Sequence, residues 1–272
     1  MSSLRSTAIF LLTAGFTLGG TATATEAQGQ QAAPRPVVAT STTPRVTSVP
    51  RPKRPTDPKG RQVFAAANAY KGMKILVSID NRWLWLVNAK RDTLMSTQIA
   101  IGMGTDFEYE GKKFRFETPR SRRRVLKKEE APKWNVPEWH YMERAQARNL
   151  ELVRLKKDDK IELADGSFLM VMGDNVGRLN HYGNFWAFTP GLEIIFDGKV
   201  FVPPMGTQQR LVPDALGPFK LDMGDGYLLH GTNIFNEDTI GDAVSHGCVR
   251  LTNEDLDRLY HLVPVGTPVF IF

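Results

Sequence analysis

Two histidines and one cysteine, residue types that can perform thiol chemistry, lie close together near the carboxyl end of the chain. The stretch HGTNIFNEDTIGDAVSHGC runs from His230 to Cys248 and includes Ser245, His246 and Gly247. A cysteine attacks a carbonyl carbon as the thiolate, so a nucleophilic Cys248 needs a base nearby. Gly247 permits a close approach of the backbone, which predicts that the last three amides of the stretch are free to stabilise an oxyanion. One interpretation of the pattern is therefore a nucleophilic cysteine that attacks a carbonyl.

Two other interpretations of the cysteine compete with catalysis. His230, His246 and Cys248 could be three ligands of a zinc ion, although their spacing matches no familiar zinc signature. Cys248 is the one cysteine of the chain, so no internal disulfide can form, and a lone cysteine is often a small buried residue. The paired histidines favour catalysis, with no metal and no cofactor.

Strand patterns occur on both sides of this stretch. KILVSIDNRWLWLVN predicts two strands joined at Asp80-Asn81, because apolar residues alternate in its second half. Asp-Gly pairs at 165–166 and 197–198 are hairpin signals between strand-like runs. The closing residues, 267–272, predict a strand buried in a sheet.

Two helices are predicted among the strands, one from about 137 to 148 and one directly after the cysteine. Thr252 and Asp255 can form a capping box at the start of the second helix, and an apolar stripe follows them. The predicted fold class is therefore mainly β, a mixed β-sheet or sandwich with a few helices.

The first 62 residues have the composition of an export signal and a tether. Arg5 followed by AIFLLTAGFTL and small residues predicts a signal peptide over 1–27, in preference to an uncleaved anchor. The Pro-rich basic stretch 28–62 cannot bury a core and predicts a linker, which leaves 63–272 as one domain. No later segment is long enough to predict a stable membrane span. We expect an exported protein of the periplasm or cell envelope.

The chain is basic, with a net charge of +6 and a pI near 9.4. This balance suits anionic partners such as acidic cell-wall polymers or phospholipid headgroups, and export disfavours nucleic acid as a partner. A merely solvated linker explains the charge equally well.

The stretch also resembles the signature of the YkuD-type L,D-transpeptidases. His230 is followed after fourteen residues by Ser-His-Gly-Cys at 245–248, and HGTN with SHGCVRL is similar to the ErfK branch. The first predicted hairpin, the closing strand and Thr118-Pro119 are also similar to family elements. Two departures concern the substrate cleft: Arg-Ser-Arg follows Thr118-Pro119 in place of a small residue and glycine, and the segment 120–190 is longer than the family leads us to expect.

The resemblance implies a role for each residue of the site. Cys248 would be the nucleophile, His230 the general base, and the Gly231 carbonyl the group that orients the imidazole. Arg250 would hold either a substrate carboxylate or the loop. Among the other implied residues, His246 and Gly247 belong to the catalytic motif, and His246 and Ser245 would brace the loop. Tyr227 either borders the substrate cleft or packs in the core.

The implied reaction belongs to peptidoglycan biosynthesis and cell-wall biogenesis. The thiolate would attack the third residue of a stem peptide, expected to be diaminopimelate, and release D-alanine with formation of a thioester. An amine of a second stem or of a wall-attached envelope protein would then form an amide, whereas water would make the enzyme an L,D-carboxypeptidase. A wall-binding module without catalysis is the alternative of another class.

The segment 120–190 is expected to affect which acceptor is used. Its basic residues 120–128 are predicted to lie in a cap that attracts an acidic second strand, although a solvated loop is an equal alternative. Trp134, Trp139 and Trp186 either line the cleft or pack in the interior.

Overall fold

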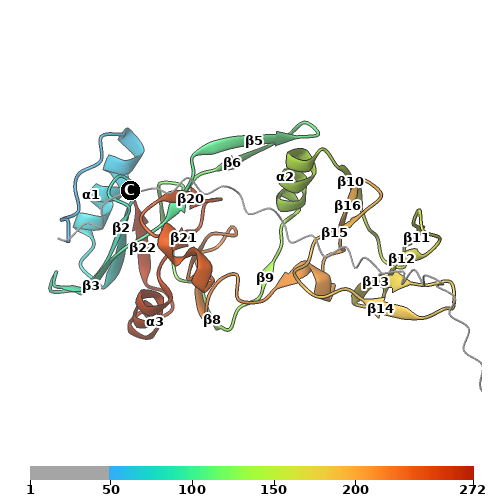
Figure 1. Ribbon diagram of the computed structural model, residues 1–272. Coiled ribbons are helices and arrows are strands. Elements are labelled where there is room, and N and C mark those ends of the chain that lie inside the picture. Colours follow the sequence, from blue (N-terminus) through green and yellow to red (C-terminus); the bar gives the residue numbers. More distant parts are fainter. Residues whose placement is uncertain (1–48) are drawn as a thin grey trace, which may run out of the picture. The chain divides into compact units, whose positions relative to one another are not determined.

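The computed structural model describes residues 49–272, so the predicted signal peptide and most of the predicted linker lie outside the described residues. Within this range the fold is mainly β, as predicted, and has three α-helices, of which α1 was not predicted (Figure 1). The described helices include none that is long and apolar enough to cross a membrane.

A five-stranded sheet contains both ends of the predicted strand pattern. Its order is β3 (Thr93–Gln98), β2 (Trp83–Val87), β1 (Lys74–Ser78), β22 (Pro268–Ile271) and β7 (Ser121–Arg124). β1 and β2 are antiparallel, and β22 is parallel to β1, so the predicted hairpin and the buried closing strand are confirmed. All residues of β1, β2 and β22 are buried because both faces of the sheet are covered.

Helix α1 (Pro58–Ala69) covers one of these faces (Figure 1). Val63 and Ala67 pack in a cluster with Trp83 and Trp85. Leu84 and Leu86, which alternate with the tryptophans, pack in the cluster on the opposite face. Asp57 caps the helix by accepting a hydrogen bond from the Gly60 N–H at 2.7 Å. Residues 58–62 of the predicted linker are therefore helical, because they form the capped first turn of a helix whose later residues Val63 and Ala67 are buried on the sheet.

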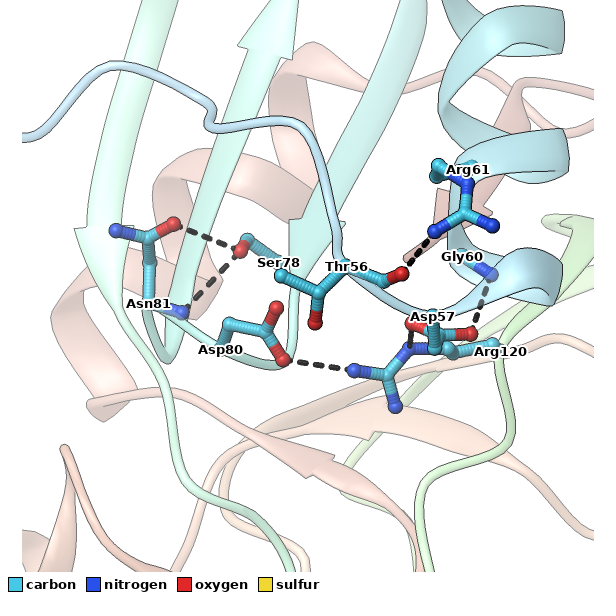
Figure 2. A network of polar contacts seen from close by, with 8 residues as sticks. All are labelled: Thr56, Asp57, Gly60, Arg61, Ser78, Asp80, Asn81 and Arg120. Atoms are coloured by element: carbon cyan, nitrogen blue, oxygen red, sulfur yellow. Dashed lines mark hydrogen bonds and ion pairs between the residues drawn. The ribbon is translucent and has the colours of Figure 1, made fainter.

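Arg120 joins α1 to the turn between β1 and β2 (Figure 2). Its guanidinium forms ion pairs of 2.7 Å with Asp57 and with Asp80. Asn81 in the same turn is held by the Ser78 hydroxyl, which accepts from the Asn81 N–H at 3.2 Å. The first basic residue of the predicted cap thus stabilises the scaffold.

A second sheet has the order β21 (Val249–Arg250), β19 (Leu228–His230), β18 (Phe219–Asp222) and β8 (Lys127–Glu130). Side chains of this sheet, of the first sheet and of α3 (Asn253–Leu262) meet in one core cluster. The predicted cap of α3 is confirmed, because the Thr252 hydroxyl accepts from the Asp255 N–H at 3.2 Å.

Residues 131–218 form an insertion between two neighbouring strands of the second sheet. Phe219 of β18 is paired with Glu130 of β8, and the Ala131 N–H donates to the Pro218 carbonyl at 2.8 Å. Residues 120–130, predicted to begin a basic cap, instead belong largely to β7 and β8. That prediction is wrong because the strand pairing places the insertion between 131 and 218.

The insertion has helix α2 (Glu138–Arg148), as predicted, and buried clusters of its own. The predicted Asp-Gly hairpins are confirmed at 165–166 and 197–198, with φ of +51° at Asp197 and +71° at Gly198. The remaining elements of the insertion are β9 (Trp134–Asn135), β10 (Glu151–Arg154), β11 (Lys160–Glu162), β12 (Phe168–Met172), β13 (Asn175–Leu179), β14 (Phe185–Ala187), β15 (Ile194–Phe196), β16 (Lys199–Val202), η1 (Gln208–Arg210) and β17 (Leu211–Val212).

Short elements lie beside the loop that precedes Cys248. β4 (Ile101–Gly102) runs parallel to β20 (Ala243–Ser245), and the 3₁₀ helix η2 (Ile234–Thr239) precedes β20. The hairpin of β5 (Thr105–Tyr109) and β6 (Lys112–Phe116) follows β4, and its aromatic face packs with residues of α2.

Candidate active site

Parallel strands bring Cys248 and His230 to one face of the second sheet. Leu229 pairs with Val249, and His230 with Arg250. Leu229 and Val249 are fully buried in the main core. Because side chains alternate along a strand, His230 and Arg250 project from the other face, and so does Cys248, two residues before Arg250. The strand pairing therefore places His230, Arg250 and Cys248 on the same face of the sheet.

The thiol of Cys248 is half-buried and donates a hydrogen bond to the Gly226 carbonyl, with a separation of 3.6 Å. Burial raises the pKa of this thiol, while the backbone N–H of Leu228 and the guanidinium of Arg250 act in the opposite direction. Since burial dominates, the thiol is protonated at neutral pH and requires a base for attack.

His230 is held in one tautomer. Its Nδ1 lies 2.6 Å from the Gly231 carbonyl oxygen, which can only accept, so Nδ1 carries the proton and Nε2 has the free lone pair. The side chain is buried, and burial, followed by the charge of Arg250, lowers the pKa of His230 to about 3. The imidazole is therefore neutral at neutral pH, and the predicted contact with Gly231 is present.

The loop from Ser245 to Cys248 is closed by hydrogen bonds of its own. The Ser245 hydroxyl donates to the Cys248 carbonyl at 2.6 Å and accepts from the Gly247 N–H at 3.1 Å. The prediction of a free Gly247 amide is therefore wrong. Ser245 is fully buried, so it braces the loop and does not border the substrate. Gly247 has φ of +134°, a conformation that side chains rarely adopt.

Thr118, noted in the sequence for its Thr-Pro pattern, supports this loop from outside. Its hydroxyl donates to the Gly247 carbonyl at 2.9 Å and accepts from the Gly102 N–H at 2.8 Å. A Cβ on Gly102 would lie 2.5 Å from the Thr118 nitrogen, so the contact requires glycine there. The hydroxyl thus ties β4 to the loop.

His246 is directed to other partners than Cys248. Its Nε2 lies 3.0 Å from a carboxylate oxygen of Glu143, and its ring stacks on Trp139 with centroids 4.2 Å apart. Across residues 49–272, no group of three or more His, Cys, Asp or Glu side chains is arranged to hold a metal ion. The sequence left Trp139 between cleft and interior, and nothing in it indicated Glu143.

Arg250 and Tyr227 complete the set of predicted residues. The guanidinium of Arg250 is half-buried and has no hydrogen bond or ion pair from its side chain to another described residue. Burial lowers the pKa of Arg250. The ring of Tyr227 lies under the guanidinium of Arg123 at 4.4 Å, and a Cβ on Gly247 would lie 3.2 Å from it. Tyr227 therefore borders the loop.

Arg123 also holds the turn that contacts the thiol. Its guanidinium donates to the carbonyls of Met223 and Gly224 at 3.3 and 3.2 Å and pairs with Asp225 at 3.1 Å. The next residue, Gly226, is the acceptor of the thiol hydrogen bond. Arg123, which was assigned from the sequence to a basic cap, is thus connected to the nucleophile through the turn at residues 223–226.

Asn253 fixes the backbone after His230 and was missed because it reads simply as the first residue of a helix. Its amide donates to the Thr232 carbonyl at 2.9 Å and accepts from the Thr232 N–H at 3.1 Å. A Cβ on Gly231 would lie 2.1 Å from the Asn253 oxygen. Close packing therefore requires glycine at the residue that orients the imidazole.

Comparisons with known proteins identify a matching family model and several similar proteins. Residues 72–271 match the family model YkuD, the L,D-transpeptidase catalytic domain. The chain is similar to "Probable L,D-transpeptidase YbiS" of Escherichia coli (strain K12), with 52% identity over 83 residues, covering 30% of this chain and 26% of that protein. It is also similar to "Probable L,D-transpeptidase ErfK/SrfK" of Salmonella typhimurium, with 37% identity over 89 residues and 28% of each chain covered.

The chain thus spans about a quarter of the length of these curated relatives. Among solved structures, the L,D-transpeptidase (residues 123–326) of Xylanimonas cellulosilytica aligns with a TM-score of 0.38 and 15% identity, covering 79% of this chain and 70% of that one.

Proposed function

Because the chain belongs to the YkuD family of L,D-transpeptidase catalytic domains, we propose that it is a cysteine acyltransferase that forms amide cross-links between peptidoglycan stem peptides. The observation that supports this most directly is the neutral His230, with a free Nε2 lone pair, on the same face as Cys248. A protonated thiol beside an unprotonated imidazole is a nucleophile with its base.

In the first step, His230 Nε2 takes the proton of the Cys248 thiol as the sulfur attacks the carbonyl carbon of the third stem residue. The tetrahedral intermediate then expels the nitrogen of the terminal D-alanine, which receives the proton from His230. The carbon–nitrogen bond breaks, and the acyl group remains on sulfur as a thioester.

We assign stabilisation of the oxyanion to backbone N–H groups of the loop. The N–H of Gly247 is already bonded to Ser245, so the candidates that remain are those of His246 and Cys248. Thr118 would hold these two amides in place, because its hydroxyl donates a hydrogen bond to the Gly247 carbonyl, which lies between them in the chain.

Arg250 is assigned to a substrate carboxylate. A half-buried guanidinium without a side-chain partner in the described part of the chain is a costly arrangement unless an anion binds it. The stem peptide carries a carboxylate on the leaving D-alanine, close to the scissile bond. Arg250 would orient the donor peptide relative to Cys248, while Tyr227 forms the wall of the cleft beside the loop.

In the second step, an amine attacks the thioester and His230 carries its proton to the sulfur. We propose the side-chain amine of diaminopimelate in a second stem as the acceptor. A wall-attached envelope protein as acceptor, or water in an L,D-carboxypeptidase, uses the same thioester. Family membership implies action on the cell wall. We accordingly propose export to the periplasm or envelope by a signal peptide at 1–27, with a linker before the catalytic domain.

The test is mass spectrometry of products made from disaccharide-tetrapeptides by the purified protein. We expect cross-linked dimers with the wild type and none with Cys248→Ala. If trimmed tripeptide were the main product at saturating acceptor, the proposed activity would be L,D-carboxypeptidase and not L,D-transpeptidase. Binding without any product would favour the wall-binding module. Intact mass after exposure to a carbapenem, which needs no acceptor, should show an adduct on the wild type and not on Cys248→Ala.

A further inference from the structure

The imidazole of His246 is held by residues outside the sheet that carries Cys248 and His230. Glu143 of α2 contacts Nε2 at 3.0 Å, and Trp139 of α2 stacks on the ring at 4.2 Å with 24° between the planes. Phe116 of β6 meets the same ring edge-on at 4.5 Å. The side chain of His246 therefore has both polar and aromatic contacts, and two of the three come from the 131–218 insertion.

Helix α2 presents these two contacts from a fixed position. Trp139 and Glu143 are four residues apart, so they lie on the same side of the helix. Further along the helix, Arg144 and Arg148 each form an ion pair of 3.0 Å with Glu193 of the insertion. The helix is thereby anchored to the insertion through one set of residues and to the loop through another.

Fixing the ring of His246 also fixes the backbone on both sides of it. Ser245 is anchored by its carbonyl, which accepts from the Met103 N–H at 2.8 Å, and Gly247 has φ of +134°. His246 lies between an anchored residue and a glycine with wide conformational freedom. Its side-chain contacts are consequently a restraint on the peptide groups that lead to Cys248.

We propose that Trp139 and Glu143 are positioning residues, which hold the Ser245–Cys248 loop in its reactive conformation by way of His246. The 131–218 insertion is then a working part of the active site, although neither residue touches the reacting atoms. This inference rests on the proposed function of Cys248 as the nucleophile, and its test includes a measurement that does not depend on transpeptidation.

The decisive variant is Glu143→Gln, which keeps the size of the side chain and removes its charge. Carbapenem acylation should slow about tenfold, the effect of one hydrogen bond to a charged group. Alkylation of Cys248 by iodoacetamide should instead become at least about twofold faster, because a loosened loop exposes a thiol that burial now keeps protonated. General damage to the fold would lower the melting temperature and would not separate the two rates in this way.

A matched control and further substitutions test whether Glu143 and Trp139 act through His246. Glu151→Gln changes an exposed glutamate just after α2, paired with Lys199 at 3.2 Å, and should leave both rates unchanged. Trp139→Phe should retain most of the acylation rate that Trp139→Leu loses, because it keeps a stacking ring. Glu143→Gln combined with His246→Gln should cost no more than His246→Gln alone, since the two residues act through one contact.

The outcomes separate this proposal from the proposed function. Unchanged acylation and alkylation rates in Glu143→Gln, or additive effects with His246→Gln, would overturn the positioning role. A lowered melting temperature without any change in either rate would also overturn it. If the wild type made no cross-links while Glu143→Gln still altered both rates at Cys248, the positioning role would stand and the transpeptidase proposal would fail.

Discussion

The burial of His230 leads to a prediction about how acylation depends on pH. A histidine with an ordinary pKa of 6.5 would be mostly protonated at about pH 5, and a base that is protonated cannot accept the proton of the thiol. Burial lowers the pKa of His230 to about 3, so its imidazole stays neutral over the whole range from about pH 5 to pH 8. We therefore expect carbapenem acylation to change less than about twofold over that range.

A His230 with an ordinary pKa would give a clearly different pH profile. About 1.5 pH units below an ordinary histidine pKa, only about one ring in thirty is neutral, so the rate would fall about thirtyfold between pH 8 and pH 5. A fall with a midpoint near the ordinary value would refute the argument from burial. The assay is stopped-flow acylation followed by intact mass, with circular dichroism at each pH to confirm that the protein is folded.

His230→Ala extends the same test to the thiol. Cys248 has a pKa raised above its ordinary value of 9.0, so less than about one thiol in a hundred is ionised at neutral pH. The variant should react about 10²- to 10⁴-fold more slowly than wild type at neutral pH. The acylation rate of the variant should rise about tenfold per pH unit as the thiol ionises, so the difference between the rates of variant and wild type should become smaller at higher pH. Strong thiolate absorbance of the wild type at neutral pH would contradict the protonated state of Cys248.

Three further predictions address the scaffold around the site. Thr118→Val removes the hydroxyl that ties β4 to the nucleophile loop, so it should lower the free energy of unfolding in urea by about 1–3 kcal/mol and slow carbapenem acylation. Arg123→Ser should slow acylation because it releases the turn that contacts the thiol. Arg124 is exposed in the same strand, so Arg124→Ser should leave the acylation rate unchanged. Equal acylation rates for the two variants would contradict the role of Arg123 in holding the turn. Burial lowers the pKa of His140 to about 4, so between about pH 6.5 and about pH 4 this residue binds more protons in the unfolded state than in the folded state. On acidification over that range His140 should lower the free energy of unfolding by at most about 1.4 kcal/mol per pH unit, in addition to the contribution of buried His230. His140→Gln should remove the His140 contribution, so that the free energy of unfolding, from denaturation curves recorded at several pH values, falls less steeply on acidification than in the wild type.

The sequence predicted the parts of the fold that depend on local patterns. Alternating apolar residues and Asp-Gly turns identified β1, β2 and the hairpins of the insertion, and Thr252 identified the start of α3. Helix α1 was missed because a Pro-rich composition precedes it and its stability comes from packing on the sheet. The segment 120–130 was misplaced because its charges resemble those of a solvated loop, whereas strand pairing put it in both sheets.

For the site, the sequence by itself indicated which residues are capable of the chemistry: Cys248 and His230 have the types that an acyl transfer needs, and the family resemblance added the Gly231 carbonyl. Only the tertiary structure decided the protonation states of these residues and the contacts that hold them in place. The neutral form of His230 depends on burial by distant strands, and the contacts of Thr118 and Glu143 join residues 129 and 103 positions apart. Such contacts leave no periodic pattern in the chain, because burial and pairing across long separations arise only when the whole fold has formed.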